Sequence, residues 1–173
     1  MSLFAELIKF SLRDFSEEGD ENAVSEKKPI SMGPWGPDEG YEWSFNEDGD
    51  AIIKQIVVYG GELIDSLTIK YEQNGYSDYA KFGGSGGGER GKINLDYPTE
   101  YLTSVSGYYQ PCTWGEGTMV TALTFVSNVR VYGPIGNEGG SHFELPLKGG
   151  MIVGFHGKMD KFINSIGVYL KPC

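Results

Sequence analysis

Residues 61–69 read GELIDSLTI, a glycine-led polar turn followed by the start of an alternating strand. The same pattern recurs at residues 117–125 as GTMVTALTF and at residues 160–168 as DKFINSIGV. In each copy, two apolar residues, a polar residue and a small residue precede apolar residues at every second position, which is typical of a strand with one buried face. A unit that occurs three times predicts three related strand-and-loop units packed about a pseudo-threefold axis.

A second series of three motifs consists of glycine loops beside aromatic residues. They read GPWGPDEGYEW from residue 33, FGGSGGGERGKI from residue 82 and YGPIGNEGGSHFEL from residue 132, and each leads into a strand-like run. From residue 30 onward the chain alternates short β-branched and aromatic runs with Gly, Pro and Asn-Gly, and no helical period lasts three turns. The sequence therefore predicts an all-β domain of about a dozen strands over residues 29–173, whose sheets must close or stack to protect their edges.

The N-terminal residues 1–28 have a different pattern. Apolar residues recur at roughly helical spacing between Leu3 and Phe15, and the polar run SEEGDENAVSEKK follows them. This pattern predicts an extension made of a short helix on a flexible tether. The other interpretation is a docking helix for a partner or for a second copy of the chain.

Composition and charge exclude several classes of partner. A net charge of −10 argues against nucleic acid and against an anionic membrane, since both require a basic surface. The sequence has no apolar stretch near the roughly 20 residues of a membrane span, and its N-terminus does not resemble a signal peptide. Two cysteines do not make a disulfide framework, so we expect free thiols in a reducing compartment, either the cytoplasm alone or the cytoplasm and nucleus.

Two motifs invite a catalytic or nucleotide-binding interpretation, and neither is favoured. Residues 86–92, GGGERGK, match the core of a phosphate loop, but Ile93 replaces the Ser or Thr that would hold Mg²⁺ and a strand follows where a helix is needed. Glu62 and Asp65 could form the acid pair of a glycosidase, but they lie three residues apart on one loop and would face the same side of a sugar. We therefore expect no enzyme activity and no cofactor. We also expect no metal site, because the Asp and His residues show no ligand spacing.

The motifs GPWG, FGGSGG, LDYPTEYLTSVSGYY, VRVYGPIGNEGGSHFELPL, IVGFHGK and IGVYLKP together resemble the jacalin-related lectins over about residues 29–172. The resemblance implies a β-prism of three four-stranded Greek-key sheets. It also implies sugar binding by a Gly-x-x-x-Asp loop completed by a neighbouring glycine-rich loop. Since the chain runs unbroken through GPWGPDEGYEW, the likeness is to the uncleaved mannose/glucose type, a type that implies a role in plant defence or stress.

The C-terminal pair of loops, the one most often used in this family, is altered here. Asp160 stands at the position of the glycine and Asn164 at that of the aspartate, while Pro37 and Glu39 interrupt the partner loop. If the glycine requires a positive φ, Asp160 strains the turn. Asn164 can still hydrogen-bond a hydroxyl, but without the strength of a charged acceptor. The resemblance thus implies a degraded second site at Gly40, Asp160, Lys161, Phe162 and Asn164.

The middle pair of loops is intact, because GELID keeps Gly61 and Asp65 and FGGSGG keeps every glycine. By resemblance, the Asp65 carboxylate accepts hydrogen bonds from O4 and O6 of a hexose, the amides of Glu62 and Leu63 donate to O5 and O6, and the Gly87 amide donates to O3 or O4. In the third pair Thr121 replaces the carboxylate, and we expect that pair to be weak or silent. The predicted carbohydrate-binding residues are Gly61, Glu62, Leu63, Asp65, Gly86 and Gly87.

These observations predict a lectin whose partners are mannose- or glucose-containing glycans. A single monosaccharide in a shallow site should bind with a Kd of about 0.1–10 mM, so useful avidity needs a homo-oligomer or a branched glycan. Of the three tryptophans, Trp114 in the glycine-flanked loop PCTWGEG is the one expected nearest a site. The alternative hypothesis is a jacalin-like protein-interaction scaffold with lost or weakened sugar binding, acting through residues 1–28.

Overall fold

The computed structural model describes residues 27–173, which form twelve strands and no helix. None of these residues therefore belongs to a helix that could cross a membrane. The predicted extension over residues 1–28 lies outside the described residues except for its last two positions, which precede the first strand. The strands are β1 (Ile30–Trp35), β2 (Tyr41–Phe45), β3 (Ile52–Gly60), β4 (Ile64–Gln73), β5 (Tyr76–Gly83), β6 (Gly88–Asn94), β7 (Leu102–Pro111), β8 (Thr118–Ser127), β9 (Val131–Gly136), β10 (Ser141–Glu144), β11 (Gly150–Met159) and β12 (Ile163–Pro172).

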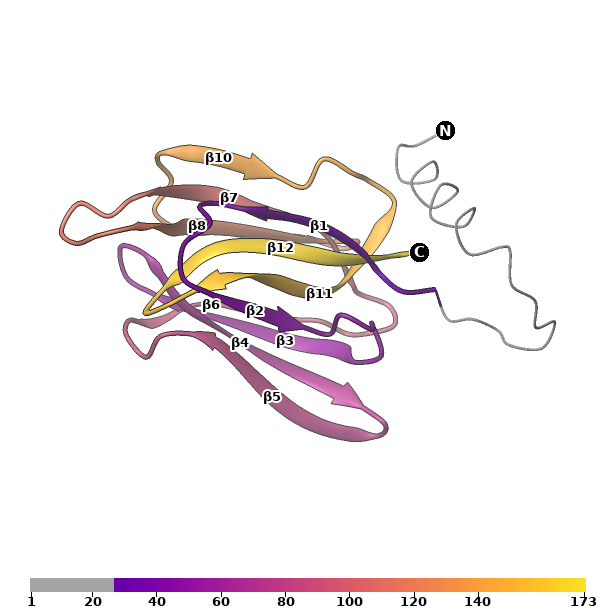
Figure 1. The fold of residues 1–173 in the computed structure, drawn as a ribbon. Coiled ribbons are helices and arrows are strands. Elements are labelled where there is room, and N and C mark those ends of the chain that lie inside the picture. Colours follow the sequence, from indigo (N-terminus) through magenta and orange to yellow (C-terminus); the bar gives the residue numbers. More distant parts are fainter. Residues whose placement is uncertain (1–26) are drawn as a thin grey trace, which may run out of the picture.

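The strands form three antiparallel four-stranded sheets, with the orders β1-β12-β11-β2, β5-β4-β3-β6 and β10-β7-β8-β9 (Figure 1). Each sheet has two long central strands joined by a short connection and two outer strands joined by a glycine loop. The first sheet combines the two ends of the domain, since β1 and β2 pair with β12 and β11. The predicted β-prism of three four-stranded sheets is confirmed.

The core is built from equivalent positions of the repeated unit. The two alternating apolar residues of each copy point inward and are completely buried. Such side chains each contribute roughly 1.5–3 kcal/mol when they leave water, so the repeat supplies much of the driving force for folding. The six residues are Leu67 and Ile69 on β4, Leu123 and Phe125 on β8, and Ile166 and Val168 on β12.

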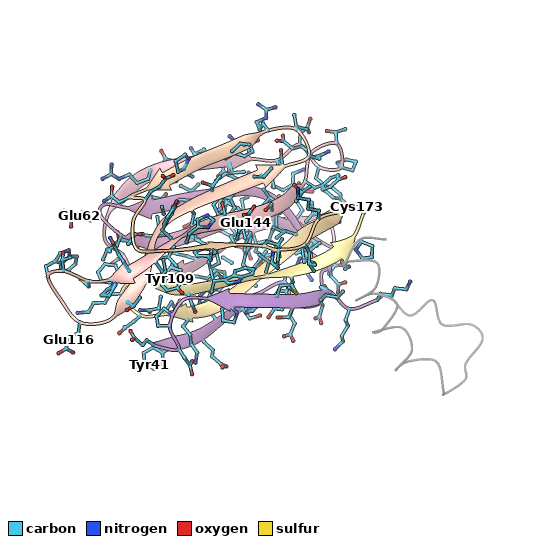
Figure 2. All side chains as sticks on the ribbon, turned by 90° about the horizontal axis from the view of Figure 1, so that it is seen from above. Tyr41, Glu62, Tyr109, Glu116, Glu144 and Cys173 are labelled. Atoms are coloured by element: carbon cyan, nitrogen blue, oxygen red, sulfur yellow. The ribbon has the colours of Figure 1, made fainter. Side chains whose placement is uncertain are left out.

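All six connections that carry the predicted site motifs lie at one end of the prism. Figure 1 shows the β3–β4, β7–β8 and β11–β12 connections at the same end as the glycine loops after β1, β5 and β9. Figure 2 shows Glu62 and Glu116 at this end and Cys173 at the other. Loops separated by more than a hundred residues in the sequence are therefore close enough to build common sites.

The opposite end contains a buried carboxylate that ties three segments together. Glu100 is 5% exposed, and its Oε1 accepts hydrogen bonds from the Tyr132 hydroxyl at 2.6 Å and the Ser127 hydroxyl at 2.8 Å. Arg130 Nε lies 3.4 Å from the same oxygen. The hydrogen bond from Tyr132 is the main cause that lowers the pKa of the Glu100 carboxyl, and this group therefore stabilises the fold in its ionised form.

Candidate functional site

The middle pair of loops forms one compact unit. The turn between β3 and β4 closes with a hydrogen bond from the Gly61 amide to the Leu63 carbonyl, 3.0 Å long. The glycine loop between β5 and β6 docks against the start of β4, where the Gly84 amide donates to the Asp65 carbonyl over 2.9 Å. The predicted turn and its predicted partner loop therefore lie in direct contact.

The Asp65 side chain lies against the bare backbone of the glycine loop. It is 7% exposed. A Cβ added at Gly86 would lie 2.8 Å from Asp65 Oδ1, and one added at Gly87 would lie 2.6 Å from Oδ2. Gly87 also has a φ of +73°, which side chains rarely adopt. Glycine at both positions is what lets the main chain, and anything bound to it, reach the carboxylate.

The Asp65 carboxylate has unused hydrogen-bonding capacity. No side chain or backbone amide among residues 27–173 donates to it, and burial alone raises the pKa of its carboxyl. The amides of Glu62 and Leu63 likewise have no backbone acceptor within the described part of the chain. Because buried polar groups are normally paired, an unpaired carboxylate beside unpaired amides is an arrangement suited to a ligand that both donates and accepts.

The backbone argument against the C-terminal turn is wrong. Gly61 and Asp160 both lack a positive φ, and a Cβ added at Gly61 would meet nothing within 4 Å. The Asp160 turn closes as the Gly61 turn does, with a 3.0 Å bond from its amide to the Phe162 carbonyl. Asp160 therefore introduces no strain, and the reason for the altered chemistry of this pair lies elsewhere.

The first glycine loop is altered at two positions, 37 and 39. Gly40 still lies beside the strand residue, since an added Cβ would lie 2.9 Å from Asn164 Oδ1. Pro37, however, occupies the place that Gly84 has in the middle loop. Proline has no N–H, so the hydrogen bond that docks the middle loop onto its strand cannot form here.

Glu39 and Asn164 both bind the protein's own backbone. Glu39 occupies the place of Gly86, and its Oε2 accepts a hydrogen bond of 3.0 Å from the Thr118 amide. Asn164 is 6% exposed and donates its Nδ2 to the Thr118 carbonyl, also over 3.0 Å, while its Oδ1 is buried without a partner. The C-terminal pair keeps its overall geometry, but Glu39 Oε2 and Asn164 Nδ2 are both bonded to Thr118 at the start of β8.

The third pair has no charged group at the position of the carboxylate. Thr121 is fully buried, and its hydroxyl lies 3.5 Å from the Tyr108 carbonyl. The Asn137 amide docks the third glycine loop by donating to the Thr121 carbonyl over 2.8 Å, as Gly84 does to Asp65. The middle and third pairs share this docking bond, and of the two only the middle pair combines it with a carboxylate and a full set of glycines.

Trp114 borders the middle pair from the β7–β8 loop. Its side chain is 62% exposed, its Nε1 donates to Glu62 Oε2 over 3.2 Å, and its ring packs edge-on against Phe162 with centroids 5.9 Å apart. The backbone of Lys161, in the same turn as Phe162, packs against Gly84. Sequence reasoning anticipated Trp114 near a site and recognised Glu39 as an interruption of the first glycine loop. It missed Thr118 as the partner of Glu39, because the two residues are 79 positions apart.

The polar groups described for this site are hydrogen-bonding groups of one turn and its neighbouring loops. Within residues 27–173, no three His, Cys, Asp or Glu side chains gather as a metal site requires. The Glu62 carboxylate is exposed and bonded to Trp114, whereas Asp65 is buried at the base of the same turn. Both acids thus belong to one turn at one end of the prism.

Comparison with known proteins identifies the family. The model of the jacalin-like lectin domain matches residues 32–169. Jacalin-related lectin 3 of Arabidopsis thaliana is 45% identical over 150 residues, which cover 85% of this chain and 24% of that protein. The mannose/glucose-specific lectin of Parkia pendula is 37% identical over 147 residues, covering 83% of this chain and 32% of that one. The chain thus spans about a quarter to a third of the length of these relatives.

Further relatives differ in what their names describe. Myrosinase-binding protein 1 of Arabidopsis thaliana is 36% identical over 144 residues, which cover 79% of this chain and 30% of that protein. Among solved structures, Malaysian banana lectin and the artocarpin–mannotriose complex each superpose with a TM-score of 0.73, at 33% and 35% identity, over 84% of this chain and 99% of theirs. The family match, the identities and the three-sheet prism show that this chain belongs to the jacalin-related lectins, a family of carbohydrate-binding proteins.

Proposed function

We propose that this chain is a lectin that binds mannose- or glucose-type glycans at the middle pair of loops, the middle site. The observation that carries the proposal is the Asp65 side chain, which is 7% exposed, lies against the backbone of Gly86 and Gly87 and has no donor among residues 27–173. The mannose/glucose-specific Parkia lectin and the artocarpin–mannotriose complex support this choice of sugar.

The chemistry follows from the donors and acceptors present. A pyranose presents fixed hydroxyls that can each donate and accept. The Asp65 carboxylate accepts from two neighbouring hydroxyls, O4 and O6, and charge makes both bonds stronger than neutral ones. The amides of Glu62 and Leu63 donate to O5 and O6, and the Gly87 amide donates to O3 or O4. No covalent bond of the sugar forms or breaks, so the proposed role is binding without catalysis.

Isothermal titration with methyl-α-mannoside tests this proposal. Wild type should bind with a Kd of about 0.1–10 mM. Asp65→Ala should abolish binding, whereas Asn164→Ala should leave it within about twofold, because Asn164 already bonds to Thr118. Methyl-α-galactoside, whose O4 points to the other side of the ring, should bind more weakly. Binding lost in Asn164→Ala but retained in Asp65→Ala would move the site to the C-terminal pair.

A protein-interaction scaffold is the second candidate function. In the C-terminal pair Glu39 is bonded to Thr118, and the myrosinase-binding relative is named for a protein partner. A glycan array would separate the two proposals. A silent array, unchanged by Asp65→Ala, supports the scaffold and contradicts the lectin, while a mannose signal that disappears in Asp65→Ala does the reverse.

Cellular location and assembly are part of the same proposal. Both cysteines are free, with Cys112 half-buried and Cys173 exposed, which supports a reducing compartment such as the cytoplasm. Because one shallow site binds weakly, we also propose that useful avidity comes from a homo-oligomer or a branched glycan.

A further inference from the structure

The β7–β8 loop, residues 112–117, is fixed at its base by groups from the altered C-terminal pair. The loop closes on itself, as the Cys112 amide donates to the Gly117 carbonyl over 2.8 Å. The next residue, Thr118, is held on both sides of its backbone: its amide donates to Glu39 Oε2 and its carbonyl accepts from Asn164 Nδ2, each at 3.0 Å. Glu39 and Asn164 come from two other strand connections, so three distant segments meet at Thr118.

The tip of this loop borders the middle site. Trp114 donates to the side chain of Glu62, the residue next to Gly61 in the GELID turn, and packs on Phe162. The Glu62 carbonyl also lies 3.5 Å from Asn137 Nδ2, so the turn is contacted from two further loops. Although Trp114 is oriented by these contacts, 62% of its surface stays in water. An oriented, exposed indole that contacts the turn leading to Asp65 is a surface to which the apolar face of a sugar ring can bind.

We propose that Glu39 and Asn164 are positioning residues that clamp Thr118 and so hold Trp114 as a wall of the middle site. The second pyranose of a mannose oligosaccharide packs against Trp114 while its first pyranose is hydrogen-bonded to the Asp65 carboxylate. The two residues that remove sugar-binding chemistry from the C-terminal pair thereby extend the middle site. This inference rests on the proposed function, because it assumes that the first sugar binds at Asp65.

The physical basis is preorganisation. A six-residue loop that samples many conformations loses entropy when a ligand fixes it, and this loss weakens binding. Two hydrogen bonds to one peptide segment remove part of that cost before the ligand arrives. The clamp should therefore change affinity for a ligand that reaches Trp114 and leave affinity for a single monosaccharide unchanged.

Glu39 provides a matched pair of variants for the test. Glu39→Ala removes the acceptor for the Thr118 amide, whereas Glu39→Gln keeps an oxygen acceptor at the same length. Glu39 is exposed, so both variants should fold. Titration with methyl-α-mannoside and with mannotriose should show an unchanged Kd for the monosaccharide in every variant. For mannotriose, Glu39→Ala and Trp114→Ala should each weaken binding about five- to tenfold, about 1–1.4 kcal/mol, and Glu39→Gln less than twofold.

A double variant establishes that Glu39 acts through Trp114. Glu39→Ala combined with Trp114→Ala should bind mannotriose no more weakly than Trp114→Ala alone, because coupled residues are not additive. Additive losses, or an equal loss for both sugars, would overturn the proposal. In the sugar-free protein, hydrogen exchange at the Thr118 amide should accelerate in Glu39→Ala and in Asn164→Ala, and unchanged exchange in both would also overturn it.

Failure of the proposed function gives a different result. If Asp65→Ala binds both sugars as wild type does, the lectin site is misplaced whatever the clamp does. If Asp65→Ala abolishes binding of both sugars but Glu39→Ala and Glu39→Gln bind mannotriose equally well, the proposed lectin site is supported and the role of Glu39 is contradicted.

Discussion

Asparagine in place of Asp65 keeps the shape of the side chain and removes its charge, so this variant separates sugar binding from stability. Hydrogen bonds to an ionised acceptor contribute about 1.5–3 kcal/mol each, roughly twice the value for a neutral one. If each of the two hydrogen bonds loses half of its free energy, the affinity for methyl-α-mannoside should fall by about 2 kcal/mol, or about 30-fold. Stability should move the other way, because the wild-type carboxylate is 7% exposed with no donor among the described residues. We expect Asp65→Asn to raise the free energy of unfolding at pH 7 by up to about 1 kcal/mol.

The pH dependence follows from the direction of the pKa shift. Burial raises the pKa of Asp65 above its ordinary value of 3.8, so the folded state holds the proton more tightly than the unfolded state. The destabilisation caused by Asp65 is complete above the folded pKa, fades as the pH falls through it and is absent below 3.8. The advantage of Asp65→Asn should therefore be largest near neutral pH and vanish in acid. The affinity of wild type for the sugar should fall over the same window.

Urea unfolding followed by tryptophan fluorescence measures the stability, and isothermal titration measures the binding. Asn164→Asp is the matched control, because it makes the reverse change at the equivalent position of the altered pair. Asn164 is 6% exposed and donates to the Thr118 carbonyl, so a carboxylate there would face an acceptor and should cost about 1–3 kcal/mol. Wild-type sugar affinity in Asp65→Asn, or a loss of more than about 1 kcal/mol of stability at pH 7, would refute the reasoning.

Three further changes test the glycine geometry and the opposite end of the prism. Gly87→Ala should abolish sugar binding and cost about 1–2 kcal/mol of stability, because φ is +73° and the new Cβ would lie 2.6 Å from Asp65 Oδ2. Gly88→Ala is the control: its new Cβ would meet nothing within 4 Å, so it should match wild type in titration and urea unfolding. Gly61→Ala should keep both affinity and stability in the same two assays, and a large loss would mean that the turn needs a positive φ after all. Glu100→Gln should lower the free energy of unfolding by about 2–3 kcal/mol at neutral pH. Since the pKa of Glu100 is lowered from 4.5, this stabilisation is present above that value and lost as the pH falls through the folded pKa, so urea unfolding of the two proteins should converge in acid.

The amino-acid sequence by itself determined the all-β class, the threefold repeat and the candidate loops. These features depend on local pattern: alternation of apolar residues specifies a strand with one buried face, and clustered glycines specify loops. Leu67, Leu123 and Ile166 recur at one position of the repeat and are all fully buried. The match of Gly61 and Asp65 to a known motif was likewise visible without coordinates.

Tertiary structure alone decided how the loops interact, because those contacts join residues far apart in the chain. Glu39 and Thr118 are 79 positions apart, and Trp114 and Glu62 are 52 apart. No local pattern encodes such pairs; they arise when three sheets bring six connections to one end of the prism. The conformation of Gly61 was also beyond the sequence, because glycine adopts positive and negative φ about equally well and only the closed turn selects one.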